Sequence, residues 1–138
     1  MKVLVDTCVW SQALRHKNPD KNITKKLSDF IDDGRAVLIG PIKQELLSGI
    51  HRAAQFEELK DILSSFEEIQ LKNMHFEKAA EFCNVCRSKG VQGSTIDFLI
   101  CSVAHSENMT IFTIDKDFEN YAKHLPIKLF KLTTQEDK

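Results

Sequence analysis

The chain opens on a short apolar run that ends in a carboxylate, and this run constrains the fold more than any other segment. Residues 3–5 are Val-Leu-Val, and Asp6 follows directly. A continuous apolar run is typical of a strand buried on both faces, as in a parallel sheet. Ligands of open α/β sheets bind beyond the carboxyl ends of the strands, where Asp6 would lie. A lone aspartate there is most simply a turn former or a helix cap, so a site requires further acids at the same edge.

Apolar runs alternate with amphipathic segments along the rest of the chain. Strands are predicted over residues 36–39, 67–71, 110–114 and 127–132. Helices are predicted over 8–15, 23–33, 41–50, 51–66, 73–89 and 119–124, and from 94 or 95 onward. Gly34 is expected to end the second helix, and Asn73 and either Ser94 or Thr95 to cap later ones. Strands alternating with helices indicate a parallel sheet with helices on both faces.

Further acids fall at positions that such a sheet brings to one edge. Asp115 ends the strand 110–114 as Asp6 ends the first strand, and Asp117 follows closely. Glu45 lies at the margin of the apolar stripe of its helix. Asp97 stands in the first turn of the most apolar helix, on its buried side, where the helix dipole favours its charge. The residues just before it already supply a cap, so capping does not explain it.

A cluster of carboxylates requires something to offset its charge. Neighbouring carboxylates repel, and one of them takes up a proton unless a cation is present. Oxygen ligands suit Mg²⁺ or Mn²⁺. Such ions serve phosphoryl chemistry, because they bind the phosphate, lower the pKa of a water and stabilise the leaving oxygen. The acids therefore favour a metal-dependent reaction at a phosphate ester.

Four segments that carry these acids resemble the PIN domain, and in detail the VapC toxins of bacterial and archaeal type II toxin–antitoxin pairs. They are Val-Leu-Val-Asp-Thr (3–7), Pro-Ile-Lys-Gln-Glu-Leu (41–46), Thr-Ile-Asp-Phe-Leu-Ile (95–100) and Thr-Ile-Asp-Lys-Asp-Phe (113–118). Each motif is short, but their order and spacing together are specific. The resemblance covers nearly the whole chain.

The resemblance implies a fold and an activity. The fold is a PIN-like three-layer α/β/α sandwich with a central parallel sheet of four to five strands over residues 1–132, followed by a polar C-terminal tail, 133–138. The activity is that of an endoribonuclease that hydrolyses RNA phosphodiester bonds with one or two Mg²⁺ or Mn²⁺ ions. The implied partners are an antitoxin whose C-terminal segment blocks the site and, in a homodimer, a second copy of the chain.

The resemblance also implies roles for single residues. The catalytic and metal-binding acids are Asp6, Glu45, Asp97 and Asp115. Asp117 matches a position that is acidic in many members, and we include it among the metal ligands. Thr7 and Thr113 match hydroxyl positions that support the acids. Of the basic residues, Lys43 and Lys116 lie nearest the site in the sequence and are the expected RNA contacts.

Three alternatives remain. A PIN nuclease of RNA processing, outside any toxin pair, has the same site, and only the neighbouring reading frame separates the two. A phospho-accepting receiver domain has a similar core but needs a pair of acids after its first strand, where this chain has Thr7 after Asp6. A catalytically silent interaction protein would bind no metal.

Composition adds limits of its own. The net charge is −1, so a nucleic-acid partner would depend on a metal or a local basic patch rather than on bulk charge. No stretch reaches the roughly 18 apolar residues of a membrane span, and Asp6 interrupts the N-terminal apolar run, so we expect a cytoplasmic protein with reduced thiols. Cys83 and Cys86 have metal-ligand spacing, but they lack a second pair and lie within a predicted helix, which favours structural thiols.

Overall fold

A computed structural model describes residues 1–132, in which strands and helices alternate as the sequence predicts. The strands are β1 (Val3–Val5), β2 (Ala36–Ile39), β3 (Glu67–Ile69), β4 (Thr110–Phe112) and β5 (Lys128–Leu129). The helices are α1 (Thr7–Leu14), α2 (Lys21–Asp32), α3 (Gly40–Leu47), α4 (Ala53–Ser64), α5 (Asn73–Ser88), α6 (Thr95–Ser106) and α7 (Asp117–Ala122). The predicted polar tail, 133–138, lies outside the described residues.

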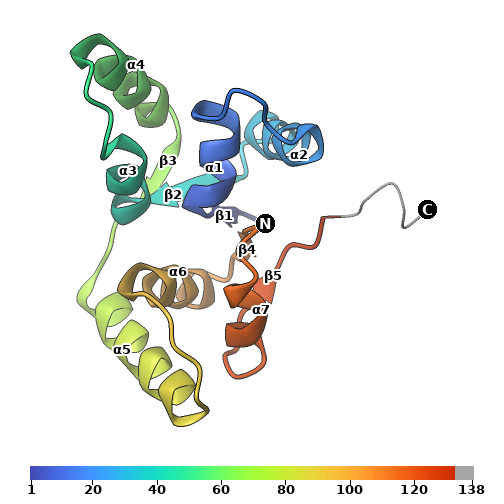
Figure 1. Cartoon of the computed structure of the whole chain (residues 1–138). Coiled ribbons are helices and arrows are strands. Elements are labelled where there is room, and N and C mark those ends of the chain that lie inside the picture. The colour runs from blue at the N-terminus through green and yellow to red at the C-terminus, as the bar shows by residue number, and fades with distance from the viewer. Residues whose placement is uncertain (133–138) are drawn as a thin grey trace.

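The strands form one parallel sheet in the order β3-β2-β1-β4-β5. Helices α1 and α2 lie on one side of this sheet, and α5 and α6 lie on the other (Figure 1). Every residue of β1 and β2 is buried, as expected of strands covered on both faces. The predicted three-layer α/β/α architecture and its parallel sheet are confirmed.

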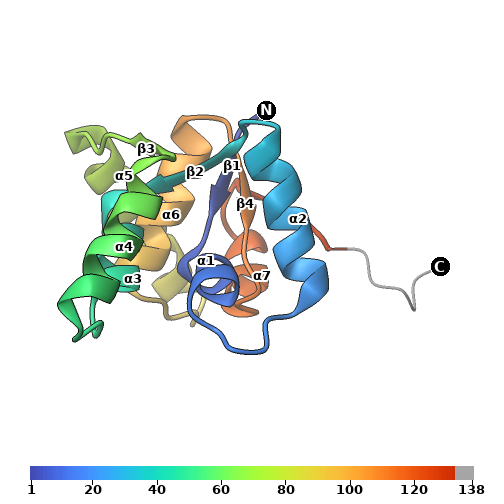
Figure 2. The same cartoon turned by 90° about the horizontal axis from the view of Figure 1, so that it is seen from above.

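The strand order places a switch point between β1 and β4. The chain runs outward from β1 to β2 and β3, and then crosses to the opposite side of β1 to form β4 and β5. Figure 2 shows β1 and β4 side by side, with α1 and α7 near the ends at which these strands finish. Ligands of open α/β sheets bind in the crevice at such a point. Asp6 follows β1 and Thr113 follows β4, so both stand at this crevice.

Several predicted boundaries were wrong, for local reasons. Helix α2 begins at Lys21, inside the predicted loop, because the Asp20 carboxylate accepts hydrogen bonds from the N–H groups of Asn22 and Ile23. Asn73 is the first residue of α5 and not its cap. The side chain of His75 instead accepts a hydrogen bond from the preceding Lys72 N–H at 3.0 Å. A residue three positions into a helix can satisfy an orphan N–H in this way.

Helix α7 begins at Asp117, two residues before the predicted start. The shift matters for function, because it places Asp117 in the first turn of a helix. Strands β4 and β5 are shorter than predicted and end at Phe112 and Leu129. Residues 113–116 therefore form a loop directly after β4, and this loop carries three of the predicted site residues, Thr113, Asp115 and Lys116.

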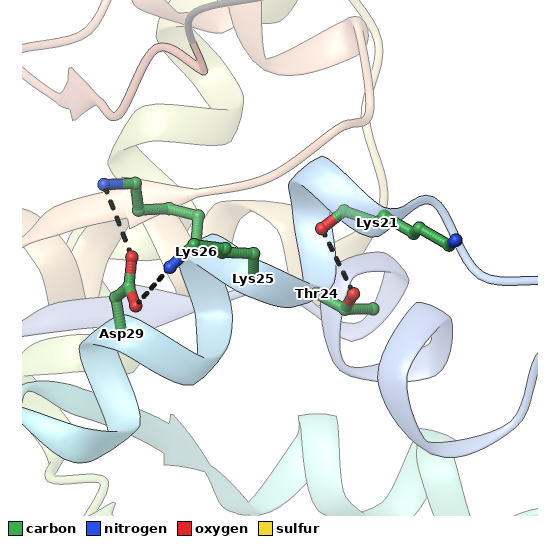
Figure 3. Close-up of polar contacts among 5 residues, drawn as sticks. All are labelled: Lys21, Thr24, Lys25, Lys26 and Asp29. Carbon is green, nitrogen blue, oxygen red and sulfur yellow. Dashed lines mark hydrogen bonds and ion pairs between the residues drawn. The ribbon is translucent and has the colours of Figure 1, made fainter.

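The outer surface of α2 shows ordinary surface electrostatics (Figure 3). The Asp29 carboxylate accepts from Lys25 Nζ at 3.3 Å and lies 4.0 Å from Lys26 Nζ, and the Thr24 hydroxyl donates to the carbonyl of Lys21. Exposed pairs of this kind contribute about 0.5 kcal/mol or less each. Within the part of the chain that the structure describes, no helix combines the length and apolar character of a membrane span.

Candidate active site

Asp6 is almost completely buried at the end of β1, with 6% of its surface exposed. One carboxylate oxygen, Oδ1, accepts from the Thr7 N–H at 2.7 Å, so Asp6 is also the N-cap of α1. The other oxygen, Oδ2, accepts from the Thr113 hydroxyl at 2.7 Å and from the Cys8 thiol at 3.5 Å. The cap is thus real, but it uses only one oxygen. The second oxygen faces the neighbouring strand end.

Two threonines join the predicted acids into a chain of hydrogen bonds. The Thr7 hydroxyl donates to Glu45 Oε1 at 2.6 Å, while its backbone N–H binds Asp6. The Thr113 hydroxyl donates to Asp6 and accepts from the Asp115 N–H at 3.0 Å. The residue after β1, helices α1 and α3, and the loop after β4 are therefore linked through two small side chains. These contacts suit the supporting positions that the sequence suggested for both threonines.

The remaining acids converge on one point. One carboxylate oxygen from each of Asp97, Asp115 and Asp117 lies within 4.8 Å of the other two. Asp97 comes from the first turn of α6, whose N-cap Ser94 accepts from the Asp97 N–H as predicted. The Asp117 N–H donates to Asp115 Oδ1 at 2.9 Å, which holds the loop against the start of α7. The early start of α7 is what brings Asp117 into the group.

The site carries unbalanced negative charge. Burial raises the pKa of Asp6, against the lowering effect of its hydrogen bonds, and the nearby charge of Asp97 raises it further. Burial likewise raises the pKa of Asp97, and the charge of Asp115 adds to the rise. Within residues 1–132, none of the five acids forms an ion pair with a basic side chain. Carboxylate oxygens without a protein cation are the donor set that Mg²⁺ or Mn²⁺ takes, so the residues fit such an ion.

The two lysines predicted to contact RNA differ in their surroundings. Lys43 Nζ lies 2.6 Å from Glu68 Oε1, so its charge is already paired across to β3. Lys116 is exposed and lines a cavity of about 350 Å³ beside Asp115, together with Phe130 and Lys131. Unlike Lys43, Lys116 forms no ion pair within residues 1–132.

Two residues at the site were not predicted from the sequence. The Cys8 sulfur lies 3.5 Å from Asp6 Oδ2 and from the Thr113 hydroxyl, and it accepts from the Ile114 N–H. Burial, together with the charge of Asp6, raises the pKa of this thiol to about 11, so it stays protonated. Tyr121 donates to Asp97. Only the four-residue spacing from Asp117, which puts both side chains on one face of α7, could have indicated it.

Cys83 and Cys86 lie apart from this site, on α5. Cys86 is fully buried and Cys83 partly buried, and both are free thiols. Neither belongs to a group of three potential metal ligands among residues 1–132. The assignment of both as structural thiols stays a prediction.

Comparison with known proteins places the fold. The PIN domain family model matches residues 3–124. Among solved structures, VapBC2 from Rickettsia felis bound to a DNA fragment from their promoter is 24% identical, with a TM-score of 0.76 over 94% of this chain and 98% of that one. FitAcB from Neisseria gonorrhoeae is 18% identical, with a TM-score of 0.72 over 94% and 96%.

A toxin–antitoxin complex from Klebsiella pneumoniae is 15% identical, with a TM-score of 0.68 over 85% of this chain and 90% of that one. Identities this low establish a shared fold only. No match was found among the curated proteins. The family model, in contrast, covers most of the chain and includes every acid at the edge of the sheet. The chain belongs to the PIN domain family.

Proposed function

We propose that this protein is a Mg²⁺- or Mn²⁺-dependent endoribonuclease and the toxin of a type II toxin–antitoxin pair. PIN domains are nucleases, which supports hydrolysis of a phosphodiester bond. The observation that carries the proposal is the convergence of Asp97, Asp115 and Asp117 within 4.8 Å, at the switch point of the sheet. Hydrogen bonds tie Asp6 to Asp115 through one bridging hydroxyl.

In this proposal the residues at the edge of the sheet have separate roles in metal binding, proton transfer and positioning. The acids that hold one or two ions are Asp6, Glu45, Asp97, Asp115 and Asp117. A bound ion would supply the charge that binds the phosphate and activates a water. One of the carboxylates accepts the proton of the attacking water. Thr7 and Thr113 hold the acids in position through their hydrogen bonds.

Two basic surfaces near the acids suit an RNA backbone. Lys116 borders the cavity beside Asp115. A second cleft, of about 390 Å³, lies between the end of α1 and the α3–α4 connection, and its basic lining residues are Arg15, His51 and Arg52. Its lining residues 49–52 follow Glu45 closely in the sequence, just beyond the end of α3 at Leu47. Local positive charge of this kind offsets the net charge of −1, which alone would not attract a polyanion.

The partner assignment rests on the structural neighbours. The Klebsiella structure is a toxin–antitoxin complex, and the Rickettsia structure is a VapBC pair on DNA. We propose a cognate antitoxin for this chain, and also a homodimer and a cytoplasmic location. The receiver-domain alternative is without support, because the PIN family model matches residues 3–124.

Expression of this chain alone is expected to arrest bacterial growth, and co-expression of its antitoxin should restore it. The physical reason is that an unblocked acidic site cleaves cellular RNA that growth requires, whereas a bound antitoxin covers the site. Growth curves after induction, with and without the short neighbouring reading frame, provide the measurement. Normal growth despite abundant folded protein would contradict the toxin assignment.

A nuclease of RNA processing is the second candidate, because it would use the same acids on a different RNA. Such an enzyme would cleave RNA in vitro without arresting growth, and no antitoxin gene would adjoin its own. Growth after induction and the identity of the neighbouring reading frame therefore separate the two.

A further inference from the structure

Tyr121 is the only tyrosine of the chain, and it is fully buried on α7. Its hydroxyl donates to Asp97 Oδ2 at 2.6 Å. Its ring packs against Phe98 and Phe118, with both centroid distances at 5.1 Å. The hydroxyl is thus held by the packing of the ring and points at a single carboxylate oxygen. Apolar packing alone does not require a hydroxyl at this position, so its bond to an acid of the candidate metal site indicates a role in orienting that acid.

Gly93 shows that the chain makes room for this contact. A Cβ atom added at Gly93 would overlap the Tyr121 hydroxyl and the ring carbon that bears it. The backbone of Gly93 does not occupy the left-handed region, so conformational freedom does not explain a glycine here. The absent side chain is explained by the space that the hydroxyl occupies. The loop before α6 therefore closes directly over the Tyr121–Asp97 bond.

The hydrogen bond from Tyr121 gives the two carboxylate oxygens of Asp97 different partners. A carboxylate can accept through both oxygens, and Tyr121 takes Oδ2, which leaves Oδ1 for other partners. Asp117 stands one turn earlier on the same helix. Tyr121 therefore ties the acid of α6 to the helix that supplies another acid of the same group.

We propose that Tyr121 is a positioning residue, which orients the Asp97 carboxylate so that the acids bind a divalent cation, with Gly93 providing the space for its hydroxyl. This inference rests on the proposed function, in which the acids hold Mg²⁺ or Mn²⁺. Partners that orient metal ligands typically contribute a factor of about 10 to 100 in metal affinity. Tyr121 does not touch the ion or the substrate in this role.

Tyr121→Phe tests the proposal, because it removes the hydroxyl and keeps the ring and its packing. We expect its Kd for Mn²⁺, measured by electron paramagnetic resonance of free Mn²⁺, to rise at least about tenfold. In RNA cleavage the half-saturating Mn²⁺ concentration should rise similarly, while the rate at saturating Mn²⁺ recovers. Gly93→Ala, which pushes the hydroxyl from its place, should raise the Kd in the same direction.

Ser102→Ala is the matched control, since it also removes one buried hydroxyl, on α6 instead of α7. The Ser102 hydroxyl donates to the carbonyl of His75 at 2.7 Å, away from the acids. We expect this variant to melt at a lower temperature and to bind Mn²⁺ like the wild type. Thermal melts in chelator report the stability of each variant separately from its affinity.

Unchanged Mn²⁺ affinity in Tyr121→Phe and Gly93→Ala would overturn the positioning role and leave Tyr121 a structural residue. If Tyr121→Phe did not fold, Gly93→Ala alone would decide by the same measurement. A wild type that bound no Mn²⁺ would overturn the proposed function instead. The two failures are therefore distinguishable in one titration series.

Discussion

Replacing Asp97 by asparagine is expected to lower metal-dependent RNA cleavage at least about a hundredfold. The new side chain can still accept the Tyr121 hydroxyl through its carbonyl oxygen, so the fold should persist. The substitution removes one of the three negative charges that would bind a divalent cation here. The measurement is the initial cleavage rate of single-stranded RNA at saturating Mn²⁺, with purified protein free of antitoxin.

Asp61→Asn is the matched control, since Asp61 is exposed on α4 and the change in net charge is the same. This variant should cleave at the rate of the wild type. Near-wild-type cleavage by a folded Asp97→Asn protein would remove Asp97 from the site.

Asp115→Asn is expected to stabilise the metal-free protein. Unit charges about 5 Å apart in water repel by about 1 kcal/mol, and the substitution removes this repulsion between Asp115 and its two acidic neighbours. The asparagine side chain keeps an oxygen that can accept from the Asp117 N–H. The expected rise in melting temperature in chelator is about 4 °C. In saturating Mn²⁺ the order should invert, because the wild type gains more binding free energy than the variant.

Asp6→Asn provides the contrast in the same thermal melts. Its amide group would replace an oxygen that accepts from either Thr7 or Thr113, so a buried hydrogen bond is lost and no stabilisation is expected. If Asp115→Asn melted below the wild type in chelator as well as in Mn²⁺, the acid would be a structural hydrogen-bond partner rather than a metal ligand.

The same melts have a defined dependence on pH. The pKa values of Asp6 and Asp97 are raised in the folded protein, mainly by burial, so the folded state binds more protons than the unfolded state. Stability of the metal-free protein therefore falls as the pH rises from about 4 through these raised pKa values. The advantage of Asp115→Asn in chelator should shrink as the pH falls, because protonation relieves the repulsion.

The edge of the sheet could be predicted from the sequence because local patterns determine it. Asp6 and Asp115 each follow an apolar strand, and parallel strands end at a common edge. The position of Asp97 follows from helical periodicity and from the cap at Ser94. These signals extend over a few residues, so they hold without knowledge of tertiary packing.

The contacts that hold the acids in place could not be predicted in this way. Tyr121 meets Asp97 across 24 positions, and Lys43 meets Glu68 across 25. Such pairs depend on how helices and strands pack. The four-residue spacing of Tyr121 from Asp117 indicates a shared face of α7, but it does not identify the partner on α6. The helix start at Asp117 was also missed, although an acid in the first turn favours a helix start through the dipole.

We propose that the acids at this edge use a divalent cation to hydrolyse RNA. The most direct measurement incubates the purified wild-type protein with single-stranded RNA in Mn²⁺ and, in parallel, in excess EDTA, and follows product formation on a gel. We expect cleavage in Mn²⁺, none in EDTA, and recovery when Mn²⁺ is added back in excess of the chelator. Equal cleavage in excess EDTA would contradict it.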